Sequence, residues 1–199
     1  MRSGKLLPIV VVCLVGVACS PRDFLTRRLA SDLLASSHNF KAPQQFFFHL
    51  GVISNKEYLS PEYLVLQRRG WITGANAPCR QIAPPPCWEV ALTPVGVETI
   101  QPLMPKDVAN QQYFPVTTAQ RQLIAVTGIS RAGNFADVDF TWKWMPANEV
   151  GAALVEGSLL YKSTVAFRHY DDGWRLVEGA PLKSNQGMDD ALKDAEPAP

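Results

Sequence analysis

The chain has 199 residues, with 19 lysines and arginines against 18 aspartates and glutamates, and a formal net charge of +1 at pH 7. This near equality of acidic and basic residues argues against a nucleic-acid surface, which needs a clustered excess of basic residues. It also argues against electrostatic binding as the main attachment to a membrane. The length indicates one domain, or one with a small appendage, large enough to bury a core.

The first 20 residues have the pattern of an export signal. Two basic residues, Arg2 and Lys5, precede an apolar run over residues 6–17, and small residues then lead to Cys19. A short apolar run behind a positively charged start is typical of a signal peptide rather than of a fold element. The run is well short of the ~20 apolar residues that a membrane-spanning helix needs.

The segment ending at Cys19 resembles the lipobox of bacterial lipoproteins, although Gly16 stands where that family usually has leucine. The resemblance implies that residues 1–18 are removed and that Cys19 carries a lipid, which attaches the chain to a membrane. Ser20 replaces the aspartate that retains enterobacterial lipoproteins at the inner membrane, so the resemblance implies an outer membrane and a periplasm-facing protein. The alternative is cleavage after Ser20, which releases a soluble exported protein.

The next segments predict a helix and then a strand. Residues 20–36 have leucines at four-residue spacing, which is typical of an amphipathic helix. Residues 46–53 are β-prone and begin with Phe46, Phe47 and Phe48. Since side chains of a strand alternate between its faces, three adjacent phenylalanines cannot all face one side. The run is therefore either buried on both faces or presents an exposed apolar patch to a partner.

Residues 60–100 contain two helix starts, at Ser60-Pro61 and Thr93-Pro94, with short strands at residues 71–73 and 88–92. This order of helix, strand, long hairpin loop, strand and helix resembles the wing of a winged-helix domain. The resemblance implies architecture only, because the segment has few basic side chains with which to bind phosphates.

Cys79 and Cys87 bracket the proline-rich loop of that hairpin. In an oxidising compartment an even pair of cysteines indicates a disulfide, and closing so short a loop contributes about 2–3 kcal/mol. The alternative is a metal or redox pair, but the spacing matches neither a zinc site nor a Cys-x2-Cys redox motif. We therefore predict a structural disulfide, and neither a metal nor a cofactor.

From about residue 111 the pattern changes to strands. Residues 136–144 alternate strictly between apolar and polar, which predicts a half-buried antiparallel strand with Trp142 and Trp144 on its covered face. Turn signals at residues 132–134 and 171–173 predict hairpins. The predicted class is α+β: a helical and winged-helix-like part (residues 19–110), an antiparallel meander (111–180) and a disordered tail (181–199).

The meander, with its closing Tyr-Asp-Asp-Gly-Trp-Arg segment, is similar to the second half of nuclear-transport-factor-like and cystatin-like sheets. Members of that fold bind apolar ligands, catalyse isomerisations or act as scaffolds, so the resemblance does not select a function. It does imply where a pocket would lie, which is inside the curve of the sheet near Trp142 and Trp144.

Three residues of the meander are candidates for acid–base chemistry. Asp137 and Asp139 share one strand face, about 6.5–7 Å apart, and paired carboxylates divide acid and base roles when their environments differ. Both also fit a solvated sheet face. His169 is a candidate general base with Asp171 as its orienting group, although turn aspartates commonly bond their own backbone.

These features lead to two hypotheses. The first is a lipid-anchored envelope protein that binds or scaffolds an envelope protein partner and contacts no nucleic acid. The second is an enzyme or small-ligand binder with an apolar pocket in the C-terminal sheet. An apolar cavity inside the sheet favours the second hypothesis, whereas a filled core with an exposed aromatic patch around residues 46–48 favours the first.

Overall fold

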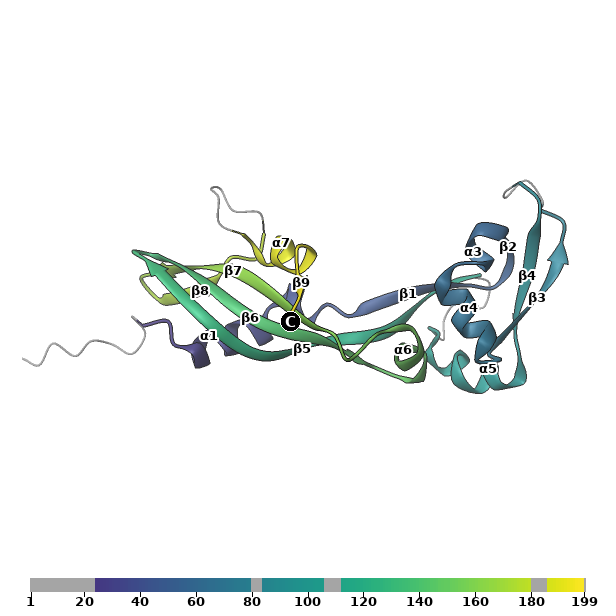
Figure 1. Ribbon diagram of the computed structural model, residues 1–199, viewed down its shortest axis with the longest axis horizontal. Coiled ribbons are helices and arrows are strands. Elements are labelled where there is room, and N and C mark those ends of the chain that lie inside the picture. Colours follow the sequence, from purple (N-terminus) through teal and green to yellow (C-terminus); the bar gives the residue numbers. More distant parts are fainter. Residues whose placement is uncertain (1–23, 80–83, 106–111, 180–185, 199) are drawn as a thin grey trace, which may run out of the picture.

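The computed structural model describes residues 24–79, 84–105, 112–179 and 186–198. It contains a six-stranded and a three-stranded antiparallel sheet. The two sheets lie toward opposite ends of an elongated molecule, and helices pack on each of them (Figure 1). The mixture of helices and antiparallel sheet confirms the predicted α+β class at this level of detail.

The larger sheet has the strand order β1-β5-β6-β7-β8, with β9 paired to β7. Its strands are β1 (Gln44–His49), β5 (Tyr113–Ala132), β6 (Phe135–Pro146), β7 (Leu160–Tyr170), β8 (Gly173–Leu176) and β9 (Glu196–Pro197). The β5–β6 and β7–β8 hairpins turn at Gly133 (φ 60°) and Gly173 (φ 124°). Positive φ angles favour glycine, and both turns agree with the hairpin signals in the sequence.

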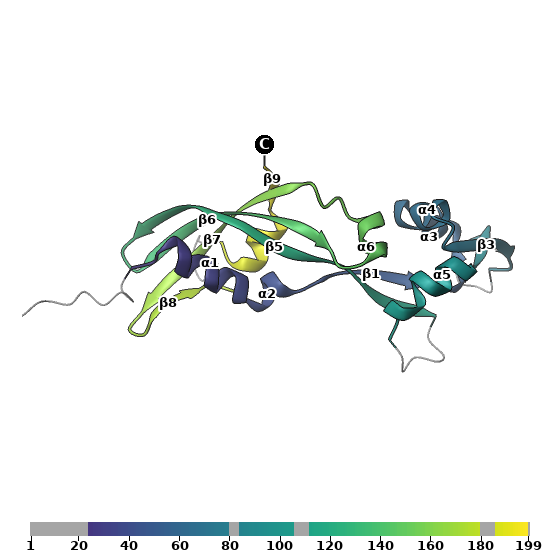
Figure 2. The ribbon, with the colours of Figure 1, turned by 90° about the horizontal axis from the view of Figure 1, so that it is seen from below.

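Three helices cover one face of this sheet: α1 (Arg27–Ser36), α2 (His38–Lys41) and α7 (Met188–Lys193). Figure 2 shows α1 and α2 lying along the sheet. Their apolar side chains join the inner residues of the strands in one core, where Leu34, Phe140 and Phe167 are fully buried. Helix α1 begins at Arg27, later than predicted, because the hydroxyl of Thr26 accepts a hydrogen bond from the Leu29 amide and caps it.

The prediction of a disordered tail over residues 181–199 is wrong for residues 186–198, which form α7 and β9. Met188 is fully buried in the core of the large sheet, and Ala191 is only 1% exposed. Backbone bonds also tie the segment to the sheet, from the Ala166 amide to the Gln186 carbonyl (2.9 Å) and from the Met188 amide to the Val177 carbonyl (2.9 Å). Tertiary burial therefore orders a segment whose composition is typical of a tail.

The smaller sheet has the order β2-β4-β3. Its strands are β2 (Gly51–Ser54), β3 (Ile72–Ala77) and β4 (Cys87–Leu92), and its helices are α3 (Asn55–Tyr58), α4 (Pro61–Arg68), α5 (Pro94–Thr99) and the 3-10 helix Gln101–Leu103. They enclose a second core that contains Ile53, Tyr63 and Leu66. Val116 of β5 and Val150 of α6 (Glu149–Leu154) belong to this core too, so β5 and α6 join the two units.

The predicted single β run over residues 46–53 is two strands in two different sheets. Strand β1 pairs with β5, whereas β2 pairs with β4. The chain changes direction at Gly51, whose φ of 84° favours glycine. Because α1, α2 and β1 all pack with the large sheet, the boundary predicted at residue 110 does not separate the two cores.

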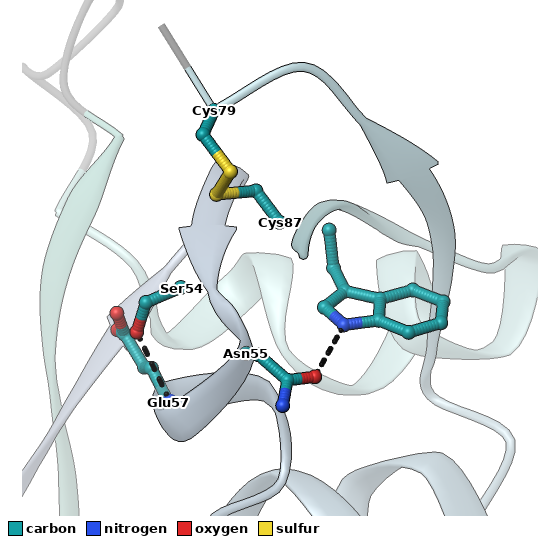
Figure 3. Close-up of a disulfide and its surroundings, with 6 residues drawn as sticks. Ser54, Asn55, Glu57, Cys79 and Cys87 are labelled. Carbon is teal, nitrogen blue, oxygen red and sulfur yellow. Dashed lines mark hydrogen bonds between the residues drawn. A yellow bond between two sulfur atoms is a disulfide. The ribbon is translucent and has the colours of Figure 1, made fainter. Parts of the chain in front are cut away.

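The predicted Cys79–Cys87 disulfide is present, with a Cα–Cα distance of 5.2 Å. It closes the β3–β4 hairpin, where Cys87 is paired with Ala77. Figure 3 shows the bridge near Ser54 and Asn55, where β2 leads into α3. The bridge therefore fixes the end of the molecule opposite the hairpins of the large sheet.

Candidate functional site

Side chains pack closely around Trp142 and Trp144 on the covered face of the large sheet, where a pocket was expected. Trp142 is 2% exposed, stacks on Tyr161 at 4.7 Å and donates its indole N–H to the Ser163 hydroxyl (3.0 Å). Trp144 lies edge-on to Trp142 at 5.4 Å. The guanidinium of Arg121 covers Trp144 at 4.3 Å. The two tryptophans are thus on the covered face as predicted, and they contribute to packing at this place.

Arg121 is a partly buried cation that holds the end of α2 against the sheet. One of its terminal nitrogens donates to the carbonyls of Asn39 (3.1 Å), Phe40 (3.5 Å) and Ala42 (3.0 Å). Burial lowers the pKa of its guanidinium, and its buried Nε has no hydrogen-bond partner. A hollow of about 210 Å³ lies beside it, lined by Asn39, Ala42, Arg121, Asp189, Leu192 and Lys193. Sequence reasoning missed this contact because Arg121 and α2 are about 80 residues apart.

Asp137 and Asp139 lie on the opposite, uncovered face of β6, as the alternation predicts. Asp137 is exposed, and Asp139 is half-buried and accepts a hydrogen bond from the Thr164 hydroxyl (2.6 Å) on β7. A strand face of this kind suits two solvated carboxylates. Of the two carboxylates, only Asp139 is hydrogen-bonded to another side chain among the described residues.

His169 lies at the hairpin end of the large sheet, where its ring packs against Trp174 at 5.0 Å. No hydrogen bond joins the described side chains of His169 and Asp171, so the expected orienting contact is not formed. An open hollow of about 390 Å³ borders the ring, lined by Asn134, Arg168, His169, Tyr170, Asp171, Asp172 and Arg175. Arg168 and Arg175 flank the Tyr170 ring at 5.1 Å each, and Asp172 pairs with Arg175.

Another histidine, His49, has a carboxylate partner, Glu57, that the sequence did not suggest. The Nδ1 atom of His49 lies 3.3 Å from Oε1 of Glu57. The hydroxyl of Tyr63 accepts from the His49 amide (2.8 Å) and donates to the His49 carbonyl (3.0 Å), and burial raises the pKa of that hydroxyl. Glu57 is eight residues from His49, too far along the chain for the sequence to indicate a contact, and the turn into α3 brings the two side chains together.

An exposed aromatic surface lies beside this pair, on the outer face of β1 and β5. Phe47 and Tyr113 stack at 5.5 Å although they are 49% and 52% exposed, and the His49 ring meets Tyr113 edge-on at 5.6 Å. Phe48 is 1% exposed on the opposite face. Phe47, His49 and Tyr113 form what we call the β1 aromatic surface, and they correspond to the exposed alternative predicted for the phenylalanine run.

Within the described ranges, no three His, Cys, Asp or Glu side chains gather where they would hold a metal ion. Comparison of the chain with protein-family models, with curated proteins and with solved structures finds no match.

Proposed function

We propose that this protein is a lipid-anchored envelope protein that binds a protein partner through the β1 aromatic surface. The lipid would be carried by Cys19 after removal of residues 1–18, and the protein would face the periplasm from the outer membrane. Cys19 lies outside the described residues, so the lipobox-like sequence supports this part of the proposal. None of the described helices has the length and apolar character that crossing a membrane requires.

One observation carries the choice of binding over catalysis: the expected pocket is packed, and an aromatic pair is exposed elsewhere. Trp142, Trp144 and Arg121 occupy the covered face of the sheet. Phe47 and Tyr113 instead place two large rings in solvent, about half exposed each. Aromatic rings are enriched in protein interfaces because they bury a large area at a low cost in conformational entropy.

The elongated shape supports a tethered arrangement. Helix α1 begins at the hairpin end of the large sheet, and the disulfide-bridged unit lies at the other end (Figures 1 and 2). An anchor that precedes α1 would therefore hold the hairpin end nearer the membrane. The β1 aromatic surface, between the two units, would then project into the periplasm.

The small unit supports the winged-helix-like part of the proposal at the level of topology. Strand β2 precedes α3 and α4, and β3, the bridged hairpin and β4 follow, with β4 in the middle of the sheet. We propose that this unit serves as a protein-contact module and binds no nucleic acid. The likeness of the large sheet to nuclear-transport-factor-like and cystatin-like proteins stays a prediction.

The anchor is tested by intact-mass measurement of the protein from a native envelope fraction, beside a Cys19→Ala variant. A mass of residues 19–199 plus a diacylglycerol-type adduct, lost in the variant, is the expected result. A lipid-free mass that begins after the signal would instead make this a soluble exported protein.

The binding surface is tested by placing a photo-crosslinking amino acid at Tyr113 and, as a matched control, at Asp137. Both positions are exposed strand residues of the large sheet, but Asp137 lies outside the β1 aromatic surface. We expect a discrete crosslinked species in the envelope from position 113 only. Equal crosslinking from both positions, or none from 113, would contradict the proposed surface.

A further inference from the structure

Strand β1 is an edge strand of the large sheet within the part of the chain that the structure describes. It is the first strand in the order β1-β5-β6-β7-β8, and β5 is its only strand partner among the described residues. Figure 1 shows it along the margin of the molecule between the two units. Edge strands expose backbone groups that can pair with another chain, and proteins commonly block them with charges, prolines or a covering segment.

The backbone groups of β1 divide into two sets. The pairs Phe46–Val116 and Phe48–Phe114 face β5, and the Leu50 amide also points that way, to the carbonyl of residue 112 (2.7 Å). The alternate residues therefore direct N–H and C=O away from β5. Both outward groups of His49 are used by the Tyr63 hydroxyl.

Gln45 and Phe47 have the same outward orientation as His49, but their backbone groups have no partner among the described residues. The free stretch is bounded on both sides. Pro43, just before β1, has no N–H to offer, and Tyr63 covers His49 at the other end. Between these limits the strand has no charged side chain to repel another strand, since its sequence is Gln-Gln-Phe-Phe-Phe-His.

We infer that a second copy of this chain pairs with β1, antiparallel and in the register that places Phe46 opposite Phe46 of the other copy. Gln45 of each copy then lies opposite Phe47 of the other. The two outward N–H groups and two outward C=O groups of each strand form four hydrogen bonds across the two-fold axis. This inference rests on the proposed binding function, because it identifies the partner of the strand that carries Phe47.

This register uses the free backbone groups of Gln45 and Phe47, and it sets Pro43 of the other copy opposite His49, whose outward groups stay bonded to Tyr63. Moving the axis to Phe47 would require His49 to give up its bonds to Tyr63. Moving it to Gln45 would oppose Phe47 with Pro43, which has no donor. An interface confined to so short a strand buries little area, so it belongs to the weak, concentration-dependent class.

The register is tested by disulfide formation between variants of residues 19–199 that carry Cys19→Ser and one introduced cysteine, and that keep the Cys79–Cys87 bridge. This version keeps residues 24–198 and so every described contact. Opposed residues of a non-hydrogen-bonded antiparallel pair have Cα atoms about 4.5 Å apart, which falls within the disulfide range of about 4.4–6.8 Å. Phe46→Cys should therefore form a covalent dimer on mild oxidation, while Gln45→Cys alone and Phe47→Cys alone should not. A mixture of those last two should form a heterodimer.

The hydrogen bonds are tested by Phe47→Pro, with Phe47→Leu as its matched control. Proline removes the outward N–H of residue 47, which has no described partner within one copy, so the fold should be kept. Both variants lose the exposed ring, and only the first loses two hydrogen bonds across the axis. We expect sedimentation equilibrium to show a dimer that Phe47→Pro weakens about 30-fold relative to Phe47→Leu.

The outcomes separate this inference from the proposed function. A monomer at all concentrations with no Phe46→Cys crosslink overturns the second copy as partner, and so does equal association of the proline and leucine variants. If the photo-crosslinker at Tyr113 then captures a different envelope protein, the binding function stands and its partner is not a second copy. If position 113 captures nothing while the Phe46→Cys dimer forms, the second copy pairs with the edge of β1, and binding through the β1 aromatic surface is contradicted.

Discussion

Replacing Arg121 tests whether one cation holds α2 against the large sheet. Arg121→Met keeps the length and apolar stem of the side chain but removes the guanidinium. Three carbonyl oxygens near the end of α2 then lose their donor, and Trp144 loses the cation that covers it at 4.3 Å. Helix α2 has only four residues and therefore depends on such contacts for its position.

The magnitude follows from these contacts and from the burial of the cation. Hydrogen bonds to a charged donor contribute about 1.5–3 kcal/mol each, and a cation over an aromatic ring about 0.5–2 kcal/mol. The net stabilisation from these contacts is smaller than their sum, because burial disfavours the charged guanidinium, as the lowered pKa of Arg121 indicates. We expect Arg121→Met to lower the free energy of unfolding by about 3 kcal/mol.

Urea denaturation followed by tryptophan fluorescence measures this change, and Arg131→Met is the control. Arg131 also covers a tryptophan, Trp174 at 5.0 Å, but it is exposed and donates only to the carbonyl of Gly133 (3.4 Å). Arg131→Met should therefore lower the free energy of unfolding by less than about 1 kcal/mol. Equal losses from the two substitutions would refute the idea that the carbonyl contacts of Arg121 position α2.

Three further predictions concern a carboxyl group, the disulfide and one glycine. Desolvation and a neighbouring aspartate raise the pKa of Glu178, so the folded state holds the proton of this carboxyl more tightly than the unfolded state does. The free energy of unfolding should therefore fall as the pH rises above about 4. Urea titrations at a series of pH values should show that Glu178→Gln removes this fall. Replacing Cys79 and Cys87 by alanine should lower the free energy of unfolding by about 2–3 kcal/mol. Gly151→Ala should lower it by about 3 kcal/mol, because a Cβ there would lie 1.8 Å from the Thr118 carbonyl oxygen.

Each of these has a control. For Glu178→Gln the control is Glu156→Gln, which replaces an exposed carboxylate. A pH profile that Glu178→Gln leaves unchanged would contradict the argument from burial. Reductant should destabilise the native chain but not the double alanine variant. Gly179→Ala meets nothing within 4 Å of its new Cβ, and a loss as large as that of Gly151→Ala would show that the close approach of α6 to β5 is not the cause.

The sequence by itself determined those features that depend on neighbouring residues. The alternation over residues 136–144 predicted β6 and placed Trp142 and Trp144 on its covered face, because strand geometry fixes which side chains share a face. The Asp-Asp-Gly turn before Trp174 and the Cys79–Cys87 bridge were predictable for the same reason: a turn or a short loop brings its own ends together. The signal at Cys19 is local too, and it stays a prediction.

Only the tertiary structure decided the features that depend on partners far away in the chain. It divided the β run at Gly51 between two sheets, because β5 and β4 offered separate edges to its two halves. It ordered α7 by burying Met188 and brought Glu57 to His49. It also left Gln45 and Phe47 at an open edge. No pattern within a few residues encodes such pairings, since their free energy comes from surfaces that meet only when the whole chain has folded.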